Sequence, residues 1–178
     1  MSSWIPLSNA WFCPLSPPKC PYHFYVSVSL GKRTGYDGLF ATLTFGNNAV
    51  PNCSKNVEVW HPISGHLDLW LSEGKLLPLG EILDISGYPA GTYRDMLLRP
   101  GSTSDVLWFY IPLGIDARRN LALSGAGAQL VLHLSFSVLY DAGVVSQKTY
   151  SCHPVLRFSV PAQTLRELIG DRGDAPQL

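Results

Sequence analysis

The chain has 178 residues, a formal net charge of zero and a charged fraction of 15%. This length suits one domain of ordinary size that buries a self-supporting core. Zero net charge argues against a protein that binds nucleic acid by simple electrostatic attraction, because such binding requires clustered Lys and Arg. The charged fraction lies below the usual value of about a quarter, which indicates a largely neutral surface that favours association.

The cysteines and the N-terminus indicate a reducing compartment. Cys13, Cys20, Cys53 and Cys152 lie far apart, and the N-terminus lacks the charged and apolar regions of an export signal. We therefore expect a cytosolic protein without a disulfide framework. No apolar run approaches the length that crosses a bilayer, so any membrane contact is expected to be peripheral.

The first 21 residues predict an extended arm, because five prolines prevent a helix and the aromatic residues are unusual in an inert tail. Trp4, Trp11 and Phe12 either fold back on the domain's own surface, or contact a neighbouring copy or a membrane interface. The arm also has the composition of a proline-rich docking peptide, without the Pro-Pro-x-Tyr spacing of a viral budding motif. The residues of this candidate peptide are Pro17, Pro18, Pro21 and Tyr22.

Alternating apolar residues predict strands in the first half of the domain. Residues 22–30 alternate between apolar residues and serine, which indicates a half-buried strand. Residues 39–45 alternate in the same way, although 36–45 is also compatible with a short helix. Two short strands at 57–60 and 66–71 are expected to form a hairpin around a Pro-Ser-Gly turn.

The middle of the chain predicts helical structure. Leucines at helical spacing in 76–85 indicate a helix that starts near Pro78, because Pro78 and Gly80 restrict where it can begin. One helical turn is expected at 93–98, within a long connection. The pattern at 116–124 is ambiguous.

The second half contains the clearest strand signal. The apolar run at 106–112 predicts a strand covered on both faces. Alternation over 128–140 predicts a long central strand. Residues 144–160 are expected to return antiparallel to it, with a break or an edge at Pro154.

These elements predict an α+β fold that is mainly antiparallel β-sheet with a few short helices packed on it, and an all-β sandwich is the alternative. We expect an extended arm at 1–21, a single strand-rich domain at 22–170 and a flexible tail at 171–178. A short amphipathic helix is expected to begin at Pro161 and to close the domain.

Residues that carry catalysis or metal binding in other proteins are present here without the spacing of such sites. Cys152 and His153 lack a second close ligand pair, so no metal and no cofactor are expected. The acidic residues share no spacing or partner histidine that marks a general acid and base, and no serine stands in a nucleophile elbow. We therefore predict no catalytic residues and no enzymatic activity. The histidines are scattered: His23, His61, His66, His133 and His153.

Two basic pairs are the candidate contacts for an acidic partner. They lie beside turns, where such pairs usually stay solvated, and no specific recognition of nucleic acid is expected. The pairs are Lys32 with Arg33 and Arg118 with Arg119.

Four segments, taken in order, resemble the layout of rhabdovirus matrix proteins, in particular the smaller plant-infecting members. They are an aromatic-led strand after a proline-rich arm, an apolar strand that ends in a Glu-Gly turn, a segment with an aromatic-then-proline ending, and a long strand that ends in Leu-Tyr-Asp. Their residues are 24–30, 67–74, 108–114 and 128–141.

The resemblance implies a viral structural protein that self-associates, binds the nucleoprotein, condenses the nucleocapsid and links it to the envelope during assembly and budding. Such a protein is expected in the virion, in the host cytoplasm and on the inner face of membranes. Matrix proteins of this family usually carry a lysine-rich arm for anionic lipid, whereas this arm has only Lys19. Contact with the inner leaflet would therefore depend on Trp4, Trp11 and Phe12.

Two other functions are compatible with the same sequence. Many alternating segments with long loops are also typical of a capsid or decoration protein of the β-sandwich type. A neutral surface is equally compatible with an intracellular, virus-encoded adaptor or host-suppressor protein.

Overall fold

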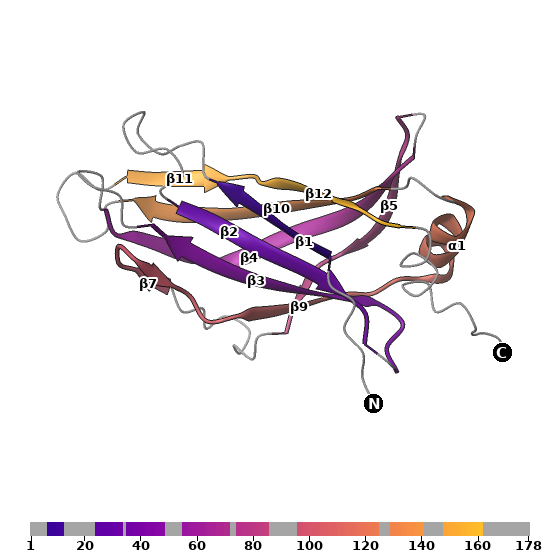
Figure 1. The fold of residues 1–178 in the computed structure, drawn as a ribbon, viewed down its shortest axis with the longest axis horizontal. Coiled ribbons are helices and arrows are strands. Elements are labelled where there is room, and N and C mark those ends of the chain that lie inside the picture. The colour runs from indigo at the N-terminus through magenta and orange to yellow at the C-terminus, as the bar shows by residue number, and fades with distance from the viewer. Residues whose placement is uncertain are drawn as a thin grey trace.

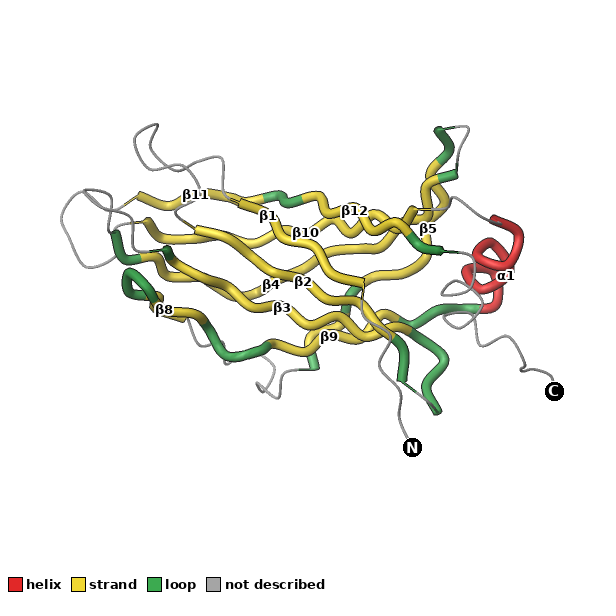
Figure 2. Tube along the Cα trace, viewed as in Figure 1, coloured by secondary structure: helices red, strands yellow, loops and turns green. Residues whose placement is uncertain are grey.

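A computed structural model describes residues 7–12, 24–33, 35–48, 55–71, 74–85, 96–124, 129–140 and 148–161. Over these residues the chain forms two antiparallel β-sheets that face each other, with one α-helix at one end of the pair (Figures 1 and 2).

Sheet A is built around two strands in which every second residue is apolar and buried. Its strands are ordered β1-β2-β3-β9-β6, and β8 pairs with the end of β3. In β2 the alternate residues from Phe24 to Leu30 are buried, whereas Ser27 on the opposite face is exposed. The strands of sheet A are β1 (Leu7–Phe12), β2 (Phe24–Gly31), β3 (Leu39–Asn47), β6 (Leu83–Asp84), β8 (Ser102–Thr103) and β9 (Leu107–Ile111).

Sheet B is organised around β10, which pairs with β4 on one side and with β11 and then β12 on the other. Pro154 separates β11 from β12, and its carbonyl oxygen accepts a 2.9 Å hydrogen bond from the Leu134 N–H. The ladder beside β10 therefore continues across the break. The strands of sheet B are β4 (Val57–Trp70), β5 (Leu76–Glu81), β7 (Met96–Leu98), β10 (Gln129–Tyr140), β11 (Lys148–Cys152) and β12 (Val155–Ser159).

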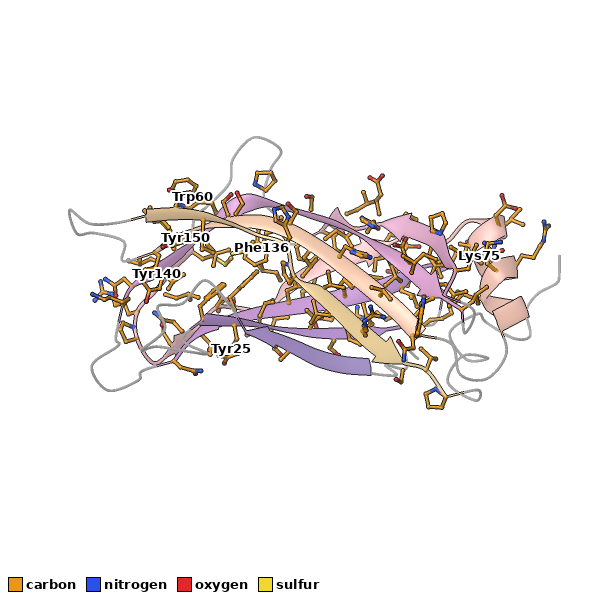
Figure 3. The ribbon with its side chains drawn as sticks, turned by 90° about the horizontal axis from the view of Figure 1, so that it is seen from above. Tyr25, Trp60, Lys75, Phe136, Tyr140 and Tyr150 are labelled. Carbon is orange, nitrogen blue, oxygen red and sulfur yellow. The ribbon has the colours of Figure 1, made fainter. Side chains whose placement is uncertain are left out.

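The hydrophobic core lies between the two sheets. Phe136 of β10 projects from sheet B toward sheet A, as Figure 3 shows from above. Its ring meets Phe45 edge to face with centroids 5.2 Å apart, and Phe24 in the same manner at 6.4 Å. Aromatic pairs of this geometry add about 0.5–1.5 kcal/mol beyond the burial of their surface. These contacts join the layers near their middle.

The two sides of the sandwich differ. On one side β1 of sheet A lies beside β12 of sheet B, which brings the sheet edges together (Figure 1). On the other side β6 ends sheet A and β7 flanks β4 in sheet B. Helix α1 (Ile115–Ser124) lies at one end near β5 and buries Ala117 and Leu121.

The structure confirms the predominance of antiparallel sheet, and the arrangement of the sheets is that of the sandwich alternative. The strands expected at 22–30, 39–45 and 128–140 are β2, β3 and β10, so the helical alternative at 36–45 is wrong. The apolar run at 106–112 contains β9, which is buried on its inner face and half-buried on its outer face. The break at Pro154 is also confirmed.

The hairpin expected within 57–71 is wrong, because these residues form the single long strand β4. Ser135 of β10 pairs with Ser64, and Ser137 pairs with Trp60, so that 61–63 oppose a single residue of β10. A bulge of this kind accommodates Pro62, which cannot donate a hydrogen bond to the ladder. Proline and glycine thus mark an irregular strand here and not a turn.

The helix expected from Pro78 is also wrong, because 76–84 contain β5 and β6. Pro78 lies in a strand with a partner on one side, next to a register shift, where a missing N–H donor is tolerated. The described part of the helical turn expected at 93–98 is the strand β7, and the ambiguous segment 116–124 is helical.

Part of the N-terminal arm belongs to sheet A. Residues Leu7–Phe12 form β1, which pairs with β2 from Leu7 opposite Leu30 to Phe12 opposite Tyr25. The expected helix after Pro161 and the tail at 171–178 lie outside the described residues.

Replacement of Gly65 by alanine tests the closeness of β4 and β10. An added Cβ at Gly65 would lie 2.2 Å from the backbone oxygen of His133, so the strands would have to separate. We expect Gly65→Ala to lower the free energy of unfolding by about 3 kcal/mol, measured by urea denaturation.

The matched control is Gly114→Ala, where an added Cβ meets no atom within 4 Å. Gly114→Ala should lower the free energy of unfolding by less than about 1 kcal/mol, although the carbonyl of Gly114 accepts the first hydrogen bond of α1. Equal stability losses in the two variants would contradict the observed approach of the strands.

Candidate functional site

Three ionisable side chains meet on the outer face of sheet B where β4 pairs with β10. His66 and Asp68 stand on the same face of β4, because one residue separates them. His133 is directly opposite His66 on β10. The alternation that buries Leu67 and Leu134 in the core turns these three side chains outward. We refer to His66, Asp68 and His133 as the outer-face cluster.

A single carboxylate oxygen faces both imidazoles of the cluster. Asp68 Oδ2 lies 3.2 Å from His133 Nε2 and 3.4 Å from His66 Nε2. The two imidazole rings are stacked, with centroids 4.5 Å apart and planes inclined by 14°. Both Nε2 atoms thus lie within 3.4 Å of the same carboxylate oxygen.

The cluster is partly shielded from water. The side chain of Asp68 is 13% exposed, that of His133 30% and that of His66 51%. The Nε2 atom of His133 is enclosed by protein and makes no hydrogen bond, since its contact with Asp68 has the distance of an ion pair without hydrogen-bond alignment. A carboxylate that is shielded from water costs free energy unless a positive charge or hydrogen-bond donors lie nearby. Asp68 therefore depends on its neighbours in the cluster for stabilisation.

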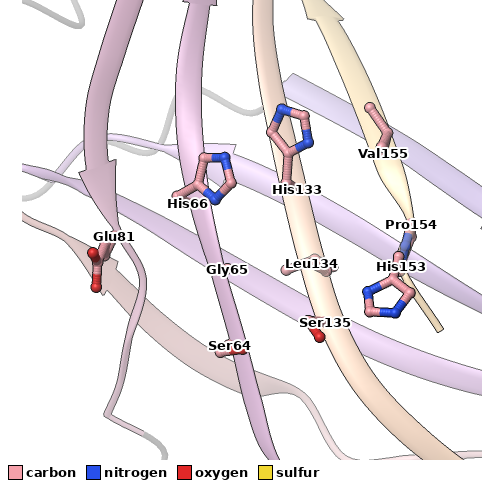
Figure 4. A pocket seen from close by; sticks show the side chains of 10 residues that line it. All are labelled: Ser64, Gly65, His66, Glu81, His133, Leu134, Ser135, His153, Pro154 and Val155. Carbon is pink, nitrogen blue, oxygen red and sulfur yellow. The ribbon is translucent and has the colours of Figure 1, made fainter. Parts of the chain in front are cut away.

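An open hollow of about 440 Å³ adjoins the cluster. Its walls come from β5, β4, β10 and the junction of β11 with β12, as Figure 4 shows. Besides the two histidines of the cluster, the hollow is lined by Glu81, Ser135 and His153. The hollow therefore offers imidazole, carboxylate and hydroxyl groups to a small polar ligand.

The aromatic residues expected to mediate association are only partly placed. The backbone of Trp11 and Phe12 belongs to β1, opposite Val26 and Tyr25 of β2. Trp4 lies outside the described residues, as does the whole candidate docking peptide: Pro17, Pro18, Pro21 and Tyr22.

The first basic pair makes contacts within the chain. Lys32 donates a hydrogen bond to the carbonyl of Tyr36, and desolvation lowers the pKa of its amino group, against an opposing effect of Asp37. The guanidinium of Arg33 lies 4.5 Å from the ring centroid of Trp108, a cation–π contact.

The second basic pair behaves similarly. Arg118 lies 3.9 Å from Asp37, and Arg119 lies 3.6 Å from Asp116. Arg118 also contributes to the lowered pKa of Lys32, so the structure brings these two cations to the same region. Arg118 and Arg119 thus have acidic partners, whereas Lys32 and Arg33 keep their charges in contacts with a carbonyl and an aromatic ring.

The outer-face cluster was not predicted from the spacing of residues in the sequence. Two signals in the sequence pointed to it: His66 and Asp68 have the spacing of one strand face, and His133 is the one ionisable residue in 129–139. The pairing of β4 with β10 brings them together across 67 residues of sequence, a distance over which spacing carries no information.

Removal of the shared carboxylate should weaken the fold. Asp68→Ala leaves the enclosed Nε2 atom of His133 without its charged neighbour, and we expect a loss of about 1–3 kcal/mol in the free energy of unfolding. Urea denaturation at neutral pH measures it. His153→Ala is the control, because His153 is exposed and lies at the edge of the same hollow. Its effect should stay within about 0.5 kcal/mol, and a larger loss there than for Asp68→Ala would contradict the assigned role.

Among the described helical residues, no stretch has the length and apolar character that a bilayer crossing requires. Comparison with protein-family models, with curated proteins and with solved structures gives no match for this chain.

Proposed function

We propose that the protein is a non-enzymatic structural protein of the viral matrix type, which associates with copies of itself through the open side of its sandwich. The observation that carries this proposal is the concentration of exposed apolar side chains at that side.

The open side is the one formed by β6, β7 and the start of β9. Leu83 lies on β6 at the end of sheet A, and Ile85 follows that strand. Leu97 lies on β7 in sheet B, and Val106 precedes β9. Each of these four side chains is between 46% and 51% exposed. Apolar side chains beside strand edges with unpaired backbone groups favour pairing with another chain.

The charge of the protein supports association of identical copies. A formal net charge of zero and a charged fraction of 15% leave little electrostatic repulsion between them. Electrostatic repulsion therefore opposes apolar contacts between copies only weakly.

The partner classes of the proposal come from the sequence resemblance to rhabdovirus matrix proteins. The proposed partners are the viral nucleoprotein and the inner leaflet of a host membrane, in the cytoplasm and in the virion. Lipid contact is assigned to Trp4, Trp11 and Phe12, because aromatic side chains favour the membrane interface.

A capsid or decoration protein is the second candidate. The two facing antiparallel sheets favour it, because sandwiches of this architecture are common in capsid domains. The two candidates differ in their need for lipid, since a matrix protein binds membranes and a capsid protein forms particles without them.

Sedimentation velocity tests association through the open side. We expect the unmodified chain to form oligomers whose proportion rises with concentration. The double variant Leu83→Lys/Leu97→Lys should sediment as a monomer, because charges placed in an apolar contact lose their hydration without a partner.

The matched control is Ile115→Lys, which places the same charge on an exposed apolar residue of α1. It should sediment like the unmodified chain. Identical distributions for the double variant and the unmodified chain would show that the open side is not the contact.

Flotation with lipid vesicles tests the membrane role of the arm. Burial of a large apolar side chain contributes about 1.5–3 kcal/mol, so Trp4→Ala/Trp11→Ala/Phe12→Ala should reduce vesicle binding by at least about tenfold. Circular dichroism checks that sheet A persists, because two of these residues lie in β1. Lys19→Ala is the control and should bind almost as the unmodified chain does. Closed particles formed without lipid, together with no flotation, would favour the capsid alternative.

A further inference from the structure

We infer that the outer-face cluster of His66, Asp68 and His133 is a binding site for a divalent transition-metal ion of the zinc class. One ligand atom from each residue can be chosen such that all lie within 4.8 Å of one another. This inference concerns a different surface from the open side and does not depend on the proposed function.

Two distances within the cluster match those between the ligands of a tetrahedral zinc ion. Ligands bound at about 2.0–2.1 Å in a tetrahedron are about 3.3 Å from each other. The two nitrogen-to-oxygen distances of the cluster, from Asp68 Oδ2 to His133 Nε2 and to His66 Nε2, are 3.2 Å and 3.4 Å. Because the stacked imidazole planes are inclined by only 14°, at least one ring has to rotate before both Nε2 lone pairs point to one ion.

The kinds of ligand select the class of metal. Imidazole nitrogen suits Zn²⁺ and its transition-metal neighbours, whereas Ca²⁺ and Mg²⁺ prefer a shell made of oxygen atoms. Two imidazoles with one carboxylate are a ligand set of catalytic zinc sites, which leave a further position for water or another ligand.

The burial of the cluster supports a cation at this place. His133 Nε2 is enclosed, makes no hydrogen bond and faces a carboxylate that is 13% exposed. A neutral imidazole that is unprotonated on Nε2 offers a lone pair at that atom, and the carboxylate is a second ligand for the same ion. A metal ion gives both atoms a partner at once.

The backbone holds the ligands in place before a metal binds. His66 and His133 are opposite each other in the ladder of β4 and β10, and Asp68 occupies the next outward position on β4. Gly65 lets the strands approach closely at this point. Ligands carried by paired strands are more rigid than ligands carried by loops, which reduces the entropic cost of binding.

Space for a further ligand is present. The hollow of about 440 Å³ beside the cluster is much larger than a water molecule, which occupies about 30 Å³ in the liquid. Water can therefore complete the coordination shell. Glu81, opposite His66 on β5, lies on the wall of the same hollow.

Titration calorimetry with ZnCl₂ on the full chain, freed of metal with a chelator at pH 7.5, tests the site. We expect binding with one high-affinity ion per chain. His133→Ala and Asp68→Asn should each weaken the affinity by at least about 100-fold, because loss of a residue that only supports a ligand already costs about 10–100-fold.

Circular dichroism accompanies each variant, and His153→Ala serves as the matched control. His153 lines the hollow but is not part of the cluster, so its variant should bind Zn²⁺ with the affinity of the unmodified chain. No binding by the unmodified chain below millimolar Zn²⁺, or equal affinities of the unmodified chain and folded His133→Ala, would overturn the inference.

Absorption spectroscopy with Co²⁺ separates this site from binding by cysteines. A site with nitrogen and oxygen ligands should give visible d–d bands without a charge-transfer band from thiolate to cobalt. A strong thiolate band at one equivalent would overturn the inference, because the cluster contains no cysteine. The spectrum does not depend on whether a variant folds, so it tests the site independently of the substitutions.

Discussion

The pairing of β10 with β4 is the constraint on which the rest of the structure depends. It extends from Gln129 opposite Trp70 to Tyr140 opposite Val57, with one interruption between Ser135 and Ser137. Since the side chains of a strand alternate between its faces, this ladder decides at once what faces sheet A and what faces outward. A shift of one residue would exchange the two faces, so the burial of the core holds the register.

The core and the outer-face cluster are two consequences of that register. Phe136 projects between the sheets and meets Phe24 and Phe45, whereas His133 on the same strand projects outward toward Asp68. Apolar burial supplies the stability, and part of it offsets the cost of holding a carboxylate and an imidazole away from water. The cluster therefore depends on the fixed register of β4 and β10.

The two proposals concern separate surfaces of one fold. The open side is formed by short strands, β6 and β7, with apolar side chains that remain about half exposed. The outer-face cluster lies over the middle of sheet B, where both strands have partners on each side. Association through an edge and binding of an ion on a face therefore do not compete for the same residues.

Local alternation in the sequence was sufficient to predict β2, β3 and β10, because the apolar residues of each strand face one core and repeat every second position. The same local evidence failed at Pro62 and Pro78, since both residues are tolerated by irregularities that depend on the neighbouring strand. Only the tertiary structure decided that β4 is continuous and that His66 meets His133. Strand register depends on how distant segments pair, so the spacing of residues within one segment does not determine it.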